Sequence, residues 1–248
     1  MKLKLFLMLL LTSATFAGKI NIAIAANVSY VIKDLKKEFN KLYPDIQVDV
    51  TLGGTGKLVA QIKHNAPYQI LLAANMDYPQ ALYDSEETST RPLVYAQGSL
   101  IALSTKEQNL SDLMNLLQND KIKRIAVANP KTAPYGQASL EAFKNAHSLK
   151  KIQSKFVYAE SISQTVTYAL KVADIGFIAK STLFSPKMKQ FKEGKHWVNV
   201  SKKLYTPISQ GVVILKKGEG NSDVSAFYAF LFSKRAEEIF KHYGYLIP

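Results

Sequence analysis

The sequence contains no cysteine, and beyond its first residues it has no apolar run of membrane-spanning length. The absence of cysteine excludes disulfides and a lipid anchor on a cysteine, so an exported form of this chain has to be stable from its hydrophobic core alone. Hydrophobic residues make up 47% of the 248 positions and charged residues 21%, which is the balance of an ordinary globular protein. A chain of this length can form one large α/β domain or two smaller ones.

Acidic residues are in the minority, because 19 Asp and Glu stand against 32 Lys and Arg and give a formal net charge of +13. The lysines occur in scattered pairs, and no basic run is interleaved with aromatic residues as in a nucleic-acid-binding surface. The pairs are Lys36-Lys37, Lys150-Lys151, Lys202-Lys203 and Lys216-Lys217. We therefore expect a solvated basic exterior and no nucleic-acid partner.

The first 17 residues have the pattern of a secretory signal peptide. Two lysines precede an apolar run from Leu5 to Leu11, and Thr15 and Ala17 are small residues at the two positions that a signal peptidase inspects. An uncleaved membrane anchor is the alternative, but the apolar run is too short to span a bilayer. The pattern predicts cleavage of residues 1–17, a mature chain that starts at Gly18, and a periplasmic location.

From Gly18 onward, short apolar runs alternate with stretches of helical periodicity. The strand patterns cover residues 18–26, 46–52, 68–74, 124–128, 155–158 and 175–179. A predicted helix or helical turn follows each of them, and Asn27 stands at the expected N-cap of the first helix. Strands that alternate with helices in this way predict parallel, doubly wound sheets.

Two crossings, near residues 98 and 209, divide the predicted elements into two groups. The first lobe is then discontinuous and consists of residues 18–98 and 210–248, and the second lobe consists of residues 99–209. The predicted fold class is α/β, with two lobes that are each a mainly parallel sheet flanked by helices. A hinged molecule with a ligand cleft between its lobes follows from this division.

Four turns place a helix N-terminus at the carboxyl end of a predicted strand, where open α/β sheets bind ligands. They lie at residues 25–27, 53–55, 133–136 and 160–163, two in each lobe. At the second turn, two glycines are expected to let the backbone turn tightly before a helix begins at Thr55. Each turn alone is consistent with an ordinary helix cap. If all four converge, their N–H groups and the side chains of Asn27, Thr55 and Tyr135 would surround a small anion with neutral donors.

Signals for catalysis and for a bound metal are weak. A Walker phosphate loop is excluded because Thr51 and Leu58 stand where glycine and a hydroxyl residue are required, which leaves Lys57 as a helix-surface charge. No G-x-S-x-G elbow surrounds a serine, and the four histidines lie far apart. We therefore expect no enzyme, no catalytic residue, no protein-bound metal and no cofactor. A tyrosinate iron site stays open, with Tyr30, Tyr135 and Tyr168 as its candidates.

Several segments together resemble the periplasmic molybdate-binding proteins of ABC transporters, a family with the type II binding-protein fold. The strongest of them are residues 22–27, GGTGKLVAQI at 53–62, NAP at 65–67, APYG at 133–136 and EEIFKHYGY at 237–245. The resemblance covers the whole mature chain. It implies a two-lobed receptor that performs no chemistry and delivers its ligand to a membrane permease.

The resemblance also implies an oxyanion site. Its residues are Ala26, Asn27, Gly54, Thr55, Tyr135 and Ile162. Asn27 with the backbone of Ala26 takes the first-helix position, Thr55 with Gly54 takes the hydroxyl position, and Ile162 supplies a backbone N–H. Tyr135 is expected to compensate for a tyrosine that some members carry near Ala179.

The physical chemistry of the ligand agrees with such a site. Molybdate and tungstate carry no proton at neutral pH, so they require donors and no carboxylate, whereas partly protonated phosphate would be better served by a nearby Asp or Glu. Glu160 is the one carboxylate at the four turns. We therefore expect a monomeric receptor for molybdate or tungstate. The alternatives are a receptor for another anion or for ferric iron and, in a different class, an exported hydrolase or phosphotransferase.

Overall fold

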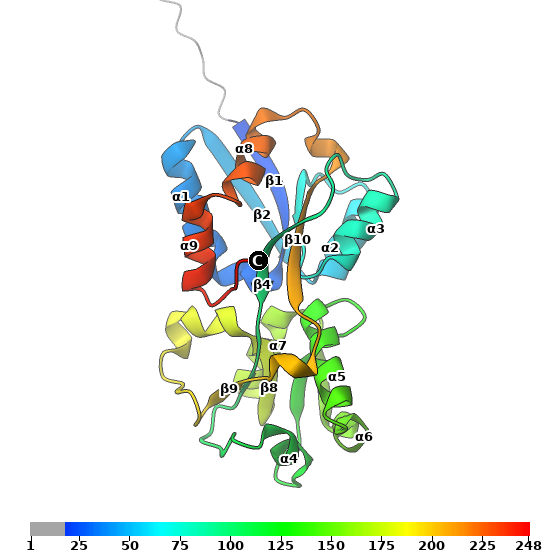
Figure 1. Cartoon of the computed structure of the whole chain (residues 1–248), viewed down its shortest axis with the longest axis vertical. Coiled ribbons are helices and arrows are strands. Elements are labelled where there is room, and N and C mark those ends of the chain that lie inside the picture. The colour runs from blue at the N-terminus through cyan, green and yellow to red at the C-terminus, as the bar shows by residue number, and fades with distance from the viewer. Residues whose placement is uncertain (1–17) are drawn as a thin grey trace, which may run out of the picture.

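The protein consists of two lobes, each built on a five-stranded sheet covered by helices (Figure 1). The computed structural model describes residues 18–248, so the expected signal peptide lies outside the described residues. The first lobe contains strands β1 (Gly18–Ala25), β2 (Ile46–Gly53), β3 (Ile70–Leu72), β4 (Leu93–Gly98) and β10 (Ile208–Ile214). Its helices are the 3-10 helix η1 (Ala26–Tyr30), α1 (Ile32–Leu42), α2 (Thr55–Lys63), α3 (Asp77–Asp84), α8 (Ser222–Phe230) and α9 (Lys234–His242).

The second lobe lies below the first in Figure 1. Its strands are β5 (Leu100–Leu103), β6 (Ile125–Ala128), β7 (Phe156–Ala159), β8 (Ile175–Ala179) and β9 (Trp197–Asn199). Its helices are α4 (Leu113–Gln118), α5 (Pro134–Asn145), α6 (Leu149–Ile152), α7 (Ile162–Lys171) and the 3-10 helix η3 (Lys180–Phe184). The predicted alternation of strands and helices is confirmed in both lobes.

Both sheets are mixed. The strand order is β2-β1-β3-β10-β4 in the first sheet and β7-β6-β8-β5-β9 in the second. The βα units pair in parallel, as the sequence pattern predicts, but β10 runs antiparallel to both of its neighbours, and so does β5. Each of these two strands begins where the chain enters a lobe from the other lobe, so its direction is set by the crossing.

Each lobe has its own hydrophobic core, in which aromatic side chains pack edge to face. In the first lobe the rings of Phe39 and Phe227 have centroids 5.0 Å apart, and in the second lobe those of Phe143 and Phe177 are 4.6 Å apart. Both cores lie against the faces of the central strands, which are almost fully buried. Two separate cores let the lobes behave as two packed bodies joined by a few strands.

Three chain segments lie at the junction of the lobes. The chain leaves the first sheet at Gly98, enters the second at Leu100, and returns along the start of β10. The C-terminal segment is the third, because Leu246 exchanges backbone hydrogen bonds of 2.7 and 2.9 Å with Gln97 (Figure 1). The C-terminus is thereby attached to a crossing strand.

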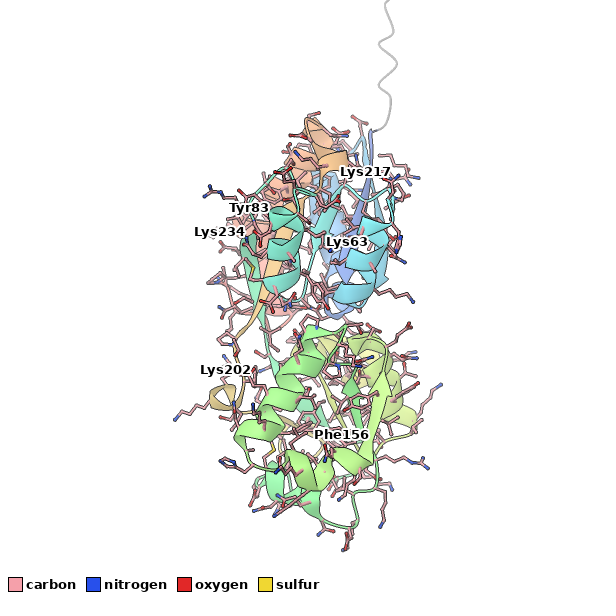
Figure 2. All side chains as sticks on the ribbon, turned by 90° about the vertical axis from the view of Figure 1, so that its right-hand side faces the viewer. Lys63, Tyr83, Phe156, Lys202, Lys217 and Lys234 are labelled. Atoms are coloured by element: carbon pink, nitrogen blue, oxygen red, sulfur yellow. The ribbon has the colours of Figure 1, made fainter. Side chains whose placement is uncertain are left out.

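The surface is basic on both lobes. Lys63, Lys217 and Lys234 on the first lobe and Lys202 on the second are exposed and point outward in Figure 2. Among the described residues, none of the helices combines the length and the apolar character that a membrane crossing requires.

The free energy of unfolding should fall as the pH rises above about 10. Burial and the hydrogen bond that Tyr243 donates to Asp34 at 2.8 Å raise the pKa of Tyr243 to about 12. Tyrosine in the unfolded chain ionises near pH 10, so between about pH 10 and about pH 12 deprotonation favours the unfolded state. Guanidinium titrations across this range should show a shallower decline for Tyr243→Phe than for the wild type. An equal decline of the free energy of unfolding in Tyr243→Phe and in the wild type would show that groups other than Tyr243 cause the pH dependence.

Candidate functional site

The structure brings all six predicted site residues around one small cavity between the lobes. The cavity is narrow, and the space in it that the centre of a water-sized sphere can reach is about 10 Å³. It is lined by Ala25, Ala26, Asn27, Gly53, Gly54, Thr55, Ala74, Ala133, Pro134, Tyr135 and Ile162. The four strand-to-helix turns therefore converge, two from each lobe. Of the lining residues, Ala74 alone lies outside the four predicted turns, and it carries no polar side chain that could have marked it.

The glycines in and directly after the second turn leave space for the other lobe because they carry no side chain. The chain passes from β2 to α2 through Gly54 alone, as the expected tight turn requires, and Gly54 does so with an extended backbone of φ −63° and ψ 138°. A Cβ at Gly54 would lie 3.1 Å from the carbonyl oxygen of Glu160 in the other lobe. At Gly56 it would lie 2.7 Å from the Tyr78 hydroxyl and 3.1 Å from Cα of Thr132. The lack of side chains here lets the second lobe approach the backbone of the first.

Thr55 is the first residue of α2, and it is 1% exposed. Its Oγ1 accepts a hydrogen bond of 3.1 Å from the backbone N–H of Ala74. The hydroxyl proton has no acceptor within residues 18–248. Since the bond from Ala74 fixes the oxygen and leaves the proton free, Thr55 is a pre-oriented donor at the cavity.

Asn27 lies inside η1 and is not an N-cap, so that prediction is wrong. Its side-chain amide lies instead at the junction of the lobes. There Nδ2 donates hydrogen bonds to Gln210 Oε1 at 2.8 Å and to the Tyr245 hydroxyl at 2.9 Å. Its backbone oxygen accepts a hydrogen bond of 2.9 Å from Ser181 Oγ of the second lobe. Asn27 thus connects the first helix, the crossing strand β10, the C-terminal segment and the second lobe.

Tyr135 follows the proline that begins α5, and it is 1% exposed. Burial raises the pKa of Tyr135 well above the ordinary tyrosine value. The phenol is therefore a neutral donor at physiological pH. A Cβ at Gly98 would collide with this hydroxyl, so the crossing strand needs glycine where Tyr135 passes beneath it.

Ile162 and Ala26 belong to the cavity through their main chains. Ile162 is the first residue of α7, whose N-cap Ser161 accepts a hydrogen bond from the Gln164 N–H, as the predicted capping box requires. The N–H groups at such a helix start have no partner within the helix. Ser163 Oγ donates to the carbonyl oxygen of Ala26 at 3.0 Å and joins the two lobes beside the cavity.

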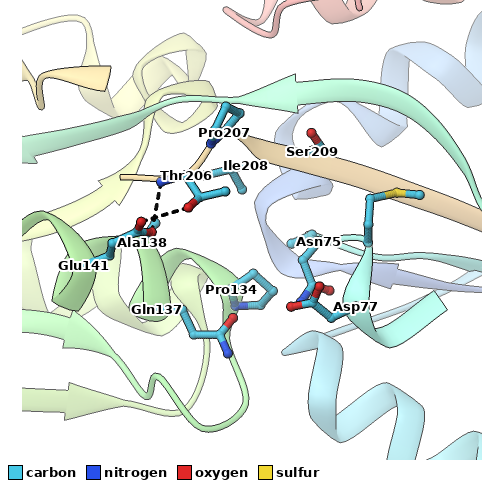
Figure 3. Close-up of a pocket in the computed structure, with 12 residues that line it drawn as sticks. Asn75, Asp77, Pro134, Gln137, Ala138, Glu141, Thr206, Pro207, Ile208 and Ser209 are labelled. Carbon is cyan, nitrogen blue, oxygen red and sulfur yellow. Dashed lines mark hydrogen bonds between the residues drawn. The ribbon is translucent and has the colours of Figure 1, made fainter. Parts of the chain in front are cut away.

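Electrostatically the cavity is neutral, because none of the charged side chains of residues 18–248 lines it. The carboxylate of Glu160, at the fourth turn, faces outward and pairs with Lys57 Nζ at 3.2 Å across the lobe boundary. A wider groove adjoins the cavity at Ala74 and Pro134. Figure 3 shows its Glu141 carboxylate accepting hydrogen bonds from the backbone N–H and the hydroxyl of Thr206, at 2.9 and 2.8 Å.

Replacing Lys57 by alanine should change the ligand affinity by less than about threefold, because exposed ion pairs contribute little to binding or stability. Lys57 and Glu160 side chains are 56% and 71% exposed. Titration calorimetry of Lys57→Ala at low and high salt measures the change in affinity. Glu160→Gln is the matched variant, because it removes the carboxylate that pairs with Lys57. A loss of affinity above about tenfold for Lys57→Ala alone would show that the ammonium group contacts the ligand.

Other candidate chemistries find less support in the geometry. Within the described chain, His, Cys, Asp and Glu side chains form no group of three or more that could hold a metal ion. Of the three tyrosines considered for an iron site, Tyr135 lines the cavity, whereas Tyr30 lines a separate groove beside Thr182. The tyrosines are therefore not gathered at the cavity.

Two lobes that enclose a buried cavity of neutral hydrogen-bond donors define a binding protein that closes over a small solute. The sequence model of a family described as bacterial extracellular solute-binding protein matches residues 20–246. The chain belongs to this family, whose members serve transport across the cell envelope.

Individual relatives are similar over almost the whole chain. The molybdate-binding protein ModA of Azotobacter vinelandii is 34% identical over 95% of this chain and 93% of its own length. The protein of the same name from Rhodobacter capsulatus is 31% identical over 93% and 89%. The solved structure of the Azotobacter vinelandii periplasmic molybdate-binding protein superposes with a TM-score of 0.85, at 26% identity, and covers 92% of this chain and 99% of that one.

Proposed function

We propose that this protein is the periplasmic receptor of an ABC transporter for molybdate or tungstate. The observation that carries the proposal is the cavity, which combines four helix starts with the hydroxyls of Thr55 and Tyr135 and has no charged lining among residues 18–248. Oriented N–H and O–H groups can replace the hydration of a dianion without a full countercharge. A protonated anion would require an acceptor there. The names of the similar proteins agree with this ligand.

The ligand contacts that we propose are Ala26, Asn27, Gly54, Thr55, Tyr135 and Ile162. Thr55 and Tyr135 donate through their hydroxyls, Ala26, Gly54 and Ile162 contribute their backbone, and Asn27 contributes at the start of η1. Tyr135 supplies the donor that Ala179 cannot give. The protein performs no catalysis on its ligand, and closure of the lobes excludes water from it.

Closure around the ligand moves two lobes relative to each other. The first lobe consists of residues 18–98 and 210–248, and the second consists of residues 99–209. We further propose that residues 1–17 are removed on export and that the mature protein acts as a monomer beside the permease. The intact mass of the exported protein and its sedimentation behaviour are the measurements that check these two statements.

Titration calorimetry on the chain without residues 1–17 tests the ligand. Molybdate and tungstate should bind far more tightly than sulfate or phosphate, and at a ligand concentration of 100 times the Kd they should stabilise the protein by about 2.7 kcal/mol. Sulfate shares the charge of molybdate and differs in size, so it is the matched control. The proposal would be refuted if neither metal oxyanion gave heat or a thermal shift. If ferric iron or phosphate bound more tightly than molybdate and tungstate, the protein would instead be a receptor for that ligand.

A further inference from the structure

The C-terminal segment carries a tyrosine into the junction of the lobes. Helix α9 ends before Gly244, whose φ of 77° turns the chain back toward β4. The backbone pairing of Leu246 with Gln97 then places Tyr245 inside the molecule, where it is 4% exposed. Its ring packs edge to face against Phe240, with centroids 5.6 Å apart. The phenol is therefore held in place by packing.

The Tyr245 hydroxyl makes two hydrogen bonds to one residue of the cavity. It accepts from Asn27 Nδ2 at 2.9 Å and donates to the Asn27 backbone oxygen at 2.9 Å. The same backbone oxygen also accepts from Ser181 of the second lobe, at 2.9 Å. Together these bonds fix both the side chain of Asn27 and the peptide group that follows it in η1.

One polar atom of Asn27 is left over. Both hydrogens of Nδ2 are used, by Gln210 and by Tyr245, while Oδ1 is buried and has no hydrogen-bond partner among residues 18–248. The hydroxyl of Tyr245 gives its one proton to the Asn27 backbone oxygen and accepts from Nδ2, so it holds the amide in this orientation, which a phenylalanine ring cannot do.

We propose that Tyr245 is a positioning residue, which acts through Asn27 to orient the first-helix donors toward the bound oxyanion. The inference rests on the proposed function, because it takes Asn27 as a ligand contact. It assigns a binding role to a residue of the C-terminal segment that does not line the cavity. The segment that is attached to the crossing strand thereby also sets the geometry of the site.

The chain offers a matched control in Tyr95. This residue of β4 is 2% exposed and packs on the same Phe240 ring, at 5.2 Å between centroids. Its hydroxyl is buried and has no hydrogen-bond partner within the described chain. Tyr95→Phe and Tyr245→Phe therefore remove the same atom from the same aromatic cluster, and the Tyr245 substitution alone removes bonds to Asn27.

The test is a double-mutant cycle measured by calorimetric titration with molybdate. Tyr245→Phe should raise the Kd about tenfold, as expected for the loss of a net hydrogen-bond contribution, and Tyr95→Phe should leave it within about twofold. In an Asn27→Ala background, Tyr245→Phe should add a smaller increase than in the wild type, because the bond from Nδ2 is already gone and only the bond to the backbone oxygen of position 27 is left to lose. A role confined to packing would give the same change in both backgrounds.

Three outcomes would overturn the inference. They are an unchanged Kd in Tyr245→Phe, an equal loss in the presence and absence of the Asn27 side chain, and a Tyr245→Phe protein that unfolds without cooperativity while Tyr95→Phe unfolds normally. The last would make the hydroxyl a structural element. If the wild type itself binds neither molybdate nor tungstate, the proposed function fails and this inference fails with it. Wild-type binding that Tyr245→Phe does not change refutes the inference alone.

Discussion

The Gly56→Ala substitution should raise the Kd for molybdate by more than about tenfold, although position 56 does not line the cavity. Its N–H donates to the carbonyl oxygen of Thr132 in the other lobe at 2.9 Å, and an added Cβ would lie 3.1 Å from Cα of Thr132. Backbone atoms cannot yield as a flexible side chain can. The lobes would close incompletely, and a fall in the closed population raises the apparent Kd in proportion.

Calorimetry gives the affinity of Gly56→Ala, and small-angle X-ray scattering with and without molybdate reports closure. The matched control is Gly218→Ala, because a Cβ there would lie 2.6 Å from the backbone oxygen of Gln69 in the same lobe and away from the cavity. Its loss of affinity should be much the smaller of the two. Wild-type affinity and full contraction in Gly56→Ala would show that the close approach of the lobes at this point is not needed for binding.

The Thr55→Val substitution should weaken molybdate binding by about 10- to 100-fold, the value expected for one hydrogen bond to a charged ligand. Valine preserves the shape of threonine and removes the donor whose proton is free in the cavity. It also leaves the buried N–H of Ala74 without the acceptor it has at 3.1 Å, so some loss of stability in the absence of ligand should accompany the effect.

The control is Thr55→Ser, which keeps the hydroxyl and should retain most of the affinity. Thermal unfolding without ligand separates the two contributions, because the Ala74 contact affects stability whether or not molybdate is present. Equal affinities of Thr55→Val and the wild type would remove Thr55 from the proposed contacts. Equal losses in Thr55→Val and Thr55→Ser would assign the effect to packing.

Much of the architecture could be predicted from local pattern. Apolar runs of strand length and helical periodicity predicted the alternation of elements. The turns that follow strands indicated Asn27, Thr55 and Tyr135 as donors, and the family resemblance implied the set of six site residues. Local pattern failed at Asn27, where an N-cap was expected and the side chain instead bonds to Gln210 and Tyr245, 183 and 218 positions away. No short-range signal can show such a partner, because it depends on how the two crossings and the C-terminus are brought together.

The glycines near Thr55 illustrate the same limit. They were expected to let the backbone turn tightly before a helix, and Gly54 makes this turn with ordinary extended dihedral angles. What requires glycine is the approach of Thr132 and Glu160 from the second lobe. Steric demands of this kind come from a distant part of the chain and leave no mark in the local sequence.

The sequence by itself determined which segments form helices after strands, that the chain contains no cysteine, and that its donor side chains at these turns are neutral. These properties depend on residue type and on spacing of a few positions, which the sequence records directly. Tertiary structure decided that four turns from two lobes meet at one cavity, that Lys57 and Glu160 pair outside it, and that Tyr245 bonds to Asn27. The two hydrogen-bonded pairs are 103 and 218 positions apart, and all of these contacts exist because the crossing strands and the C-terminal segment bring both lobes to one junction.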